Sequence, residues 1–225
     1  MLKQFIVEER IEKIEKQKDV GRAKKLTIIS AFLQHCLGEV LEIPAAEVRF
    51  SYGPWGKPAL QNSDLDFSLS HSGNYAVLAV SDALVGIDVE HLRRDRLHIA
   101  KRFFYESEYR DIDRLSDERE KNIRFLEYWT MKEAYVKRAG KGLQIPLDSF
   151  VITRDLQQSS RTVSEDGTEI WFATHFLKDS YAVSICSEKK RELEMLKKEN
   201  FREILFADLK KEGMSIENNT QKDGI

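Results

Sequence analysis

The sequence predicts an α+β protein whose strands form antiparallel sheets. Segments with the two-residue period of strands come in runs, and segments with the longer period of helices come before, between and after those runs. Strands that alternate singly with helices would instead favour a parallel, doubly wound sheet. The order of segments is helix, loop, three strands, helices, three strands and helix. Two similar α+β halves would explain this order.

Composition narrows the functional classes. The 225 residues are 41% hydrophobic, enough for a core, and the net charge of −2 excludes a chain that binds nucleic acid non-specifically as a whole. No apolar run is long enough to span a membrane, and the first residues lack the apolar region of a signal peptide. The two cysteines, Cys36 and Cys186, are too few for a disulfide framework or a cysteine metal cluster. We expect both to be core thiols of a cytoplasmic protein.

The first elements can be placed in order along the chain. Residues 4–18 predict a short amphipathic helix, and residues 22–41 predict a longer one with a continuous apolar stripe. Residues 50–60 are dense in glycine and proline and predict a structured loop. Residues 65–90 change to the period of strands and predict three of them. A turn expected at residues 81–83 separates the last two strands, which could pair as a hairpin.

Helices and strands come in separate runs beyond residue 90. Three helices are expected at residues 95–104, 106–115 and 119–139. Three further strands are expected in SFVITR, EIWFATHFL and YAVSICS. From residue 188 the chain predicts a last, charged helix, and the polar tail after about residue 211 is expected to be disordered. The chain is thus divided into an N-terminal half at residues 1–90, a C-terminal half at residues 91–190, and an extra helix and tail at residues 191–225.

Two carboxylates stand close together in the strand VGIDVE. Side chains alternate between the faces of a strand, so Asp88 and Glu90 share one face while Ile87 and Val89 point into a core. Neighbouring carboxylates repel unless a cation lies between them, and an all-oxygen ligand set suits Mg²⁺ or Mn²⁺. An acidic strand end in water is the alternative interpretation, and the pair alone does not exclude it.

The helix that contains WTMKEAYVKRAGKGL carries a polar face. Steps of four residues place Trp129, Glu133 and Lys137 on this face. Glu133 could supply a third acid, with Lys137 one turn further on. The alternative is an ordinary surface pair of Glu and Lys, although Trp129 argues against full exposure of the face. The glycines that follow permit the backbone to approach a ligand closely.

Two upstream segments carry groups that suit a phosphate. In SLSHS, His71 lies where a strand meets a turn, and hydroxyls, backbone N–H groups and an imidazole can together hold a phosphate. Lys57, in a stiff Gly-Lys-Pro loop, could act as a point charge. Each residue alone has a plain alternative, a strand-end histidine without a ligand and a solvated lysine. Together with the acids they indicate a metal-assisted reaction on a phosphate ester or anhydride.

These motifs occur together in a known family. GIDVE, then FF-x-x-x-EY, then W-x-x-KEA-x-x-K-x-x-GKGL, with SHS and GKP upstream, resemble the motifs of the 4′-phosphopantetheinyl transferases. Their spacing resembles that of the long, surfactin-activator class. The resemblance covers about residues 21–152. It implies a pseudo-dimer of two α+β halves, sufficient as a monomer, with the active site in the cleft between them.

The resemblance also implies an activity. Family members transfer the phosphopantetheine arm of coenzyme A to a serine of an apo carrier protein and release adenosine 3′,5′-bisphosphate. They use Mg²⁺, with Mn²⁺ as an alternative, and the ligands carry over onto Asp88, Glu90 and Glu133. Two other hypotheses are an Mg²⁺-dependent hydrolase of coenzyme A or a related nucleotide, and a non-catalytic module that binds coenzyme A or a carrier. The implied partners do not include nucleic acid or a membrane.

Individual roles follow from the matched motifs. Glu133 is the expected general base, directly or through a metal-bound water, and Lys137 is expected to stabilise the α-phosphate or the leaving group. The contacts to coenzyme A carry over onto Lys57, Ser70 and His71, and candidates for its first basic contacts are Arg10, Lys13 and Arg22. Trp129 is expected to pack beneath the helix and orient Glu133. Lys132 lies 100° around the helix from Glu133, which favours a supporting role.

The sequence departs from the long class at both ends. That class usually begins with a β-strand, whereas this chain opens on helical sequence. The first strand of the N-terminal half is therefore expected to be absent or supplied differently. The charged helix at residues 188–212 is extra, and it could cover an exposed sheet edge.

Overall fold

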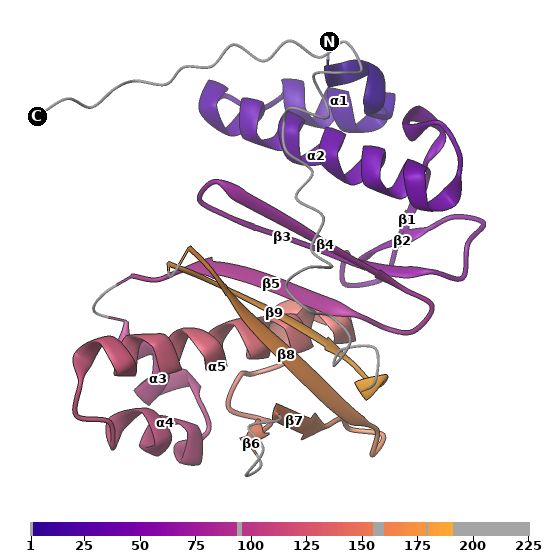
Figure 1. Cartoon of the computed structure of the whole chain (residues 1–225). Helices are drawn as coiled ribbons and strands as arrows, with labels where there is room; N and C mark the ends of the chain where they lie inside the picture. Colours follow the sequence, from indigo (N-terminus) through magenta and orange to yellow (C-terminus); the bar gives the residue numbers. More distant parts are fainter. Residues whose placement is uncertain (1, 94–95, 155–159, 179, 191–225) are drawn as a thin grey trace, which may run out of the picture. The chain divides into compact units, whose positions relative to one another are not determined.

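The computed structural model describes residues 2–93, 96–154, 160–178 and 180–190 (Figure 1). These residues belong to two compact units, one containing Met1–Val48 and the other Arg49–Lys198. The predicted C-terminal helix, apart from its first residues, and the polar tail lie outside the described residues. No helix in the described part of the chain is long and apolar enough to cross a membrane.

The first unit is helical. A short 3-10 turn, η1 (Leu2–Phe5), precedes α1 (Glu8–Glu15) and α2 (Val20–Leu41), and η2 (Ala45–Glu47) follows them. The α2 helix begins where it does because the Asp19 side chain accepts a hydrogen bond from the Arg22 backbone N–H at 2.9 Å. Both helices predicted at this end are confirmed, and so is the opening on helical rather than strand structure.

The second unit begins with a hairpin that the sequence analysis missed. Residues 50–60 were expected to form a loop, but β1 (Phe50–Tyr52) pairs antiparallel with β2 (Pro58–Leu60). The glycines and proline that indicated a loop occupy the turn between the strands, where Gly56 has a φ of +84°. The Gly53 N–H donates to the Lys57 carbonyl at 2.9 Å and closes that turn.

The three strands predicted within residues 65–90 are present, but their predicted pairing is wrong. The strand β3 (Asp66–Ser72) pairs antiparallel with β4 (Tyr75–Ser81), and β5 (Gly86–His91) pairs with a strand about one hundred residues further along. The reason is the two-residue connection Gly73-Asn74, in which Gly73 has a φ of +54°, as tight hairpin turns require. Residues 81–83 therefore lead from one sheet to another instead of closing a hairpin.

The main sheet has five antiparallel strands in the order β5-β9-β8-β7-β6. The strands β8 (Glu169–Leu177) and β9 (Tyr181–Ser187) match the predicted EIWFATHFL and YAVSICS. SFVITR contributes only β6 (Thr153–Arg154), and β7 (Ser160–Val163) was not predicted. The β7 strand is short and three of its four residues are polar, so its sequence alone does not distinguish it from a loop. The α+β class with antiparallel sheets is confirmed.

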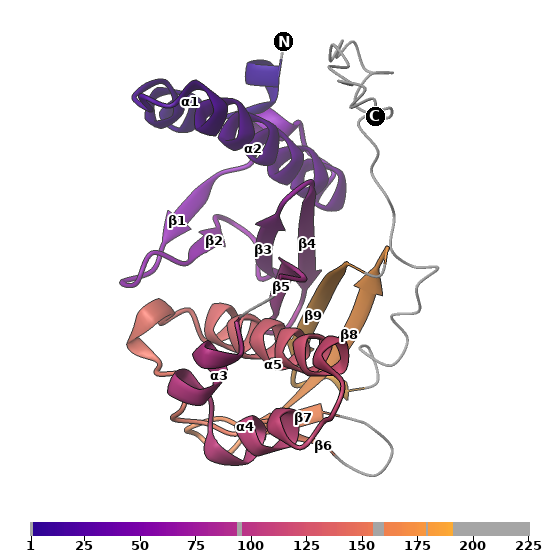
Figure 2. The same cartoon turned by 90° about the vertical axis from the view of Figure 1, so that its left-hand side faces the viewer.

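Three helices accompany this sheet, as predicted: α3 (Leu97–Phe103), α4 (Glu106–Asp113) and α5 (Glu118–Ala139). The α5 helix lies along β5 and β9 (Figure 2). It begins at Asp117, whose side chain accepts from the Glu120 N–H, and ends at Gly140 with a φ of +69°. Gly86 allows α5 to approach β5 closely, since a Cβ there would lie 1.9 Å from the Ala134 carbonyl oxygen.

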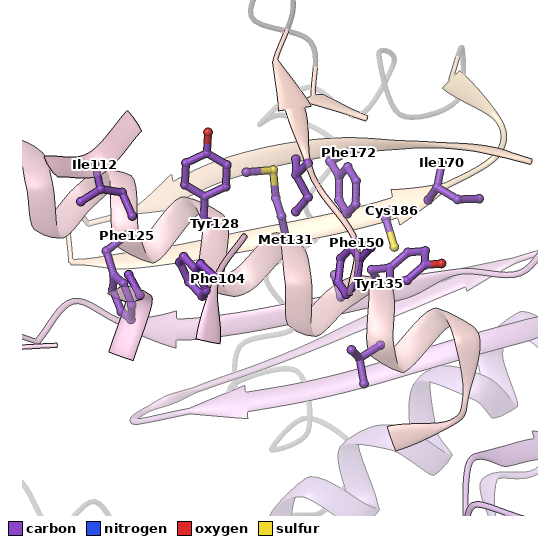
Figure 3. Packing of buried hydrophobic residues seen from close by; sticks show 14 residues of the cluster. Phe104, Ile112, Phe125, Tyr128, Met131, Tyr135, Phe150, Ile170, Phe172 and Cys186 are labelled. Atoms are coloured by element: carbon purple, nitrogen blue, oxygen red, sulfur yellow. The ribbon is translucent and has the colours of Figure 1, made fainter. Parts of the chain in front are cut away.

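The core of this unit lies between α5 and the sheet. Met131 and Tyr135 of α5 belong to one buried cluster with Phe172 and Cys186 of the sheet (Figure 3). Both cysteines are buried, so the prediction of core thiols is confirmed. Burial raises the pKa of the Cys186 thiol to about 12, which keeps it protonated and unreactive.

Candidate active site

Alternate polar residues of β3, namely Asp66, Ser68, Ser70 and Ser72, face β5 rather than solvent. The Val85 N–H donates to Oδ2 of Asp66 at 2.9 Å, and the Ile87 N–H donates to Oγ of Ser68 at 3.0 Å. Side chains of β3 thus satisfy backbone groups at the edge of β5, where no strand ladder is formed. The alternation in LDFSLSHS predicts an ordinary strand. In the structure, its polar side chains also connect the β3–β4 sheet to β5 of the main sheet.

Two further hydroxyls of β3 bind the carboxylates of β5. Ser70 Oγ donates to Oδ1 of Asp88 at 2.7 Å, and Ser72 Oγ donates to Oε1 of Glu90 at 2.9 Å. Glu90 Oε1 also accepts from the His91 N–H at 2.9 Å. The two acids lie two residues apart on β5, and the two hydroxyls that orient them lie two residues apart on β3. Ser72 was not among the predicted site residues, although the two-residue period places it on the same face as Ser70.

A cavity of about 450 Å³ brings the predicted residues together. It is lined by Leu69, Ser70, His71, Asp88, Val89, Glu90, Trp129, Glu133 and Lys137. These residues come from β3, β5 and α5, all within the second compact unit. Segments on both sides of residue 90 contribute to it. The predicted polar face of α5, with Trp129, Glu133 and Lys137, therefore lines a cavity and does not lie in open solvent.

Lys137 contacts a different acid from the one its spacing suggests. Its Nζ donates to Oδ1 of Asp88 at 2.6 Å and to Oγ of Ser70 at 2.7 Å. A surface pair with Glu133, the plain alternative at the sequence level, is not the arrangement observed. Lys137 instead connects the helix to β5 and β3, with its side chain 30% exposed.

Burial, with a smaller contribution from neighbouring charges, raises the pKa values of two acids in the cavity. Burial raises the pKa of Glu133, the negative charges of Asp88 and Glu90 raise it further, and Lys137 opposes the shift. Burial also raises the pKa of Asp88, against the lowering effect of Lys137 and Ser70. Carboxylates with raised pKa values in one cavity mark a candidate functional site, because added positive charge would stabilise their ionised forms.

The three carboxylates of the cavity suit a divalent ion, but two of them, Asp88 and Glu90, are hydrogen-bonded to other side chains. The carboxylates of Asp88, Glu90 and Glu133 supply only oxygen, the donor that Mg²⁺ prefers. In the described part of the chain, no group of three His, Cys, Asp or Glu side chains is arranged to hold a metal ion together. Asp88 is instead bound by Lys137 and Ser70, and Glu90 by Ser72.

Lys57 lies away from the cavity. Its Nζ donates to Oδ2 of Asp66 at 2.8 Å and to the Arg138 carbonyl at 3.2 Å. The second bond satisfies one of the carbonyls that remain without partners at the end of a helix. Lys57 therefore joins the β1–β2 turn, β3 and the end of α5. Its predicted contact with coenzyme A stays a prediction.

The N-terminal basic candidates belong to the other compact unit. Arg10 lies on α1, and its Nε donates to Oγ of Ser30 on α2 at 3.1 Å. Arg22 lies exposed in the first turn of α2, and Lys13 lies in the last turn of α1. None of the three lines the cavity described above. Their predicted contacts with coenzyme A stay predictions.

Lys132 and Glu108 form a buried ion pair that the sequence did not predict. Lys132 Nζ lies 2.8 Å from Oε2 of Glu108, and their side chains are 0% and 1% exposed. Lys132 therefore does not line the cavity and is not exposed to solvent, and its supporting role stays a prediction. The only signal for Glu108 was its position in the FF-x-x-x-EY motif.

Two family models cover most of the chain. A model described as "4'-phosphopantetheinyl transferase, N-terminal" matches residues 3–83, and one described as "4'-phosphopantetheinyl transferase superfamily" matches residues 84–186. The second match contains β5, α3, α4, α5 and the rest of the main sheet. The boundary between the two matches lies just before the strand that carries Asp88 and Glu90.

Individual relatives match along most of their length. The 4′-phosphopantetheinyl transferase Sfp of Bacillus subtilis is 30% identical over 185 residues, which are 81% of this chain and 82% of that protein. The 4′-phosphopantetheinyl transferase psf-1 of Bacillus pumilus is 32% identical over 84% of this chain and 81% of its own length. Among solved structures, a holo-(acyl-carrier-protein) synthase from Bacillus anthracis is 19% identical, with a TM-score of 0.39 over 46% of this chain and 93% of its own. Because the two relatives match over more than four fifths of their own lengths, this chain belongs to the 4′-phosphopantetheinyl transferase family.

Proposed function

We propose that this protein transfers the 4′-phosphopantetheine group of coenzyme A to a serine of an apo carrier protein, with Mg²⁺ or Mn²⁺ as cofactor. One observation carries the proposal: three carboxylates and a lysine from β5 and α5 line a single cavity, in a chain of this family. The reaction forms a bond between the serine oxygen and the phosphorus that bears pantetheine. The bond from that phosphorus to the bridging oxygen breaks, and adenosine 3′,5′-bisphosphate leaves.

Asp88, Glu90 and Glu133 are the proposed metal ligands. The bound ion would neutralise charge on the pyrophosphate of coenzyme A. Ser70 and Ser72 support this role, because they orient Asp88 and Glu90 at 2.7 and 2.9 Å. Partners of this kind hold ligating carboxylates in place.

Glu133 is the proposed general base. It accepts the proton of the carrier serine, whose hydroxyl is a weak nucleophile until it is deprotonated. Burial and the charges of Asp88 and Glu90 raise the pKa of Glu133 in the metal-free protein, which makes its carboxylate a stronger proton acceptor. Trp129 lines the cavity one turn earlier on α5 and packs against the hydrophobic core cluster, as a residue that positions the helix would.

Positive and hydrogen-bonding groups are proposed to hold the phosphates of coenzyme A. Lys137, Ser70 and His71 line the cavity with the three acids. His71 is exposed at the end of β3, where it is accessible to a phosphate. Lys57, Arg10, Lys13 and Arg22 are proposed only as more distant contacts to coenzyme A.

The division of the chain is also part of the proposal. Two α+β halves meeting near residue 90 are supported by the two family matches, which meet between residues 83 and 84. The cavity has residues from both sides of this point. One chain would then contain a complete site, and a monomer would suffice.

A mass measurement tests the activity. The protein is incubated with coenzyme A, Mg²⁺ and each of a panel of apo carrier proteins, and the carriers are weighed by mass spectrometry. A carrier that gains the mass of one phosphopantetheine supports the proposal, and Asp88→Ala is expected to abolish that gain while keeping the circular dichroism spectrum. Release of adenosine 3′,5′-bisphosphate without a carrier would favour the hydrolase. Coenzyme A binding without any reaction would favour a non-catalytic module.

A further inference from the structure

Lys137 binds Asp88, a carboxylate that a metal ion in the cavity would also bind. Its Nζ is 2.6 Å from Oδ1 of Asp88, the shorter of the two polar contacts that this oxygen makes with Lys137 and Ser70. The Asp88 side chain is 8% exposed and that of Lys137 is 30% exposed. The carboxylate is thus held in place, whereas the ammonium ends a flexible four-carbon chain that can move without the backbone. Lys137 is the mobile partner of this pair.

A second cation at Asp88 would meet strong repulsion. An ammonium and a divalent ion bound to the same buried carboxylate would lie within a few ångströms of each other, where water screens them poorly. Ser70 would not prevent an exchange, because its Oγ donates to Asp88 and accepts from Lys137. It can therefore keep Asp88 oriented after Lys137 has left.

We propose that Lys137 is an exchangeable counter-ion of Asp88: it holds the acid until a phosphate of coenzyme A draws the ammonium away, and only then does Asp88 bind Mg²⁺ tightly. The inference rests on the proposed function and adds an order to it. Coenzyme A and Mg²⁺ bind with positive coupling, and by linkage each raises the affinity for the other by the same factor. Couplings of this kind are commonly about 5- to 150-fold.

The arrangement of the other acids fits this exchange. Glu133 lines the same cavity, and Glu90 is oriented by Ser72 independently of Lys137. Of the three acids, Asp88 alone has an ion pair with a basic side chain in the described part of the chain. Releasing this one ion pair would therefore leave all three carboxylates of the cavity without a bound ammonium group.

Mg²⁺ titration by calorimetry tests the exchange. Binding is measured with and without saturating coenzyme A, and a titration of Mg²⁺ into coenzyme A alone is subtracted. Lys137→Met removes the charge and keeps most of the chain length. Without coenzyme A, we expect this variant to bind Mg²⁺ at least about fivefold more tightly than the wild type does. Coenzyme A should then raise the Mg²⁺ affinity of the variant much less than it raises that of the wild type. Wild-type affinity for Mg²⁺ is expected to rise at least about fivefold with coenzyme A.

Two further variants separate the exchange from other effects. Lys137→Arg keeps a cation beside Asp88 and is expected to bind Mg²⁺ as weakly as the wild type. Lys141→Met removes an exposed lysine from just beyond the same helix and is expected to leave Mg²⁺ binding unchanged. Circular dichroism establishes that each variant is folded.

The exchange can be disproved while the proposed function stands. If Lys137→Met and the wild type bind Mg²⁺ equally, or if coenzyme A raises the affinity of both by the same factor, the exchange is wrong whether or not carriers are modified. Conversely, a gain in Mg²⁺ affinity confined to Lys137→Met supports the exchange even in preparations that modify no carrier tested.

Discussion

The Lys132 ammonium lies 2.8 Å from Oε2 of Glu108, and both side chains are almost completely removed from solvent. Lys132 also donates to the Leu147 and Phe150 carbonyls, at 2.7 and 2.9 Å, and Glu108 accepts from the Ile152 N–H at 2.8 Å. This pair thus joins α4, α5 and the segment that precedes β6. Because Lys132 and Glu133 are adjacent on α5, the buried pair sets the rotation that turns Glu133 toward the cavity.

Removing one member of this pair should lower the free energy of unfolding. Burial raises the pKa of Glu108 and lowers that of Lys132, and their mutual contact is the largest influence that opposes these shifts. We expect Lys132→Met to lower the free energy of unfolding by about 3–5 kcal/mol, measured by urea denaturation with circular dichroism. The double variant Lys132→Met/Glu108→Gln buries no unpaired charge and should be more stable than the single variant. A single variant as stable as the wild type would contradict this account.

Gly86 should be intolerant of even one added methyl group. A Cβ at this position would lie 1.9 Å from the Ala134 carbonyl oxygen and 2.8 Å from the Arg138 nitrogen, so α5 would have to move away from β5. We expect Gly86→Ala to lower the free energy of unfolding by about 1–3 kcal/mol and to reduce carrier modification. Gly53→Ala is the control, since its nearest contact would be 3.7 Å from the Lys57 oxygen. Equal thermal stability of the two variants would speak against the close contact.

Substitutions of two serines of β3 should have different effects, one on stability and the other on metal binding. Ser68 Oγ accepts from the buried Ile87 N–H, so we expect Ser68→Ala to cost about 1–3 kcal/mol of unfolding free energy and to leave Mg²⁺ affinity unchanged. Ser72 Oγ orients Glu90, so we expect Ser72→Ala to weaken Mg²⁺ binding by about 10-fold or more. Calorimetry and urea denaturation on both variants provide the comparison. If Ser72→Ala changes stability alone, Ser72 does not position Glu90.

Glu133 should reduce the stability of the metal-free protein at neutral pH. The pKa of its carboxyl is raised in the folded state, so its contribution to stability is complete below the unfolded pKa and is lost as pH rises through the folded pKa. Glu133→Gln cannot ionise. With a chelator present, we expect it to be more stable than the wild type at pH 8, and the difference to disappear as pH falls below the usual value of 4.5.

An exposed glutamate controls for the general effect of removing charge. The Glu165 side chain is 83% exposed, and we expect Glu165→Gln to change the free energy of unfolding by less than about 0.5 kcal/mol at either pH. A Glu133→Gln variant that is less stable than the wild type at pH 8 would show that ionised Glu133 is stabilising. That result would also weaken its assignment as a base with a raised pKa.

Periodicity predicted the local structure well because it reports which face of an element is buried. The four-residue spacing placed Trp129, Glu133 and Lys137 on one face of α5, and the two-residue spacing placed Asp88 and Glu90 on one face of β5. Both faces line the cavity. The same reasoning failed for residues 50–60, where short strands around a glycine-rich turn carry too few residues to show a period.

In the described part of the chain, the sequence by itself determined the α+β class, the helices, most strands and the polar side chains that line the cavity. It did not determine which residues those side chains contact in the folded protein. Lys137 pairs with Asp88, 49 residues away, rather than with Glu133 one turn along its own helix. β5 pairs with β9 rather than with the neighbouring β4, and Lys57 binds Asp66 and the end of α5. Helix and strand periods depend on neighbours in the chain, whereas these pairings depend on which surfaces are buried together, and that is decided only when the chain folds.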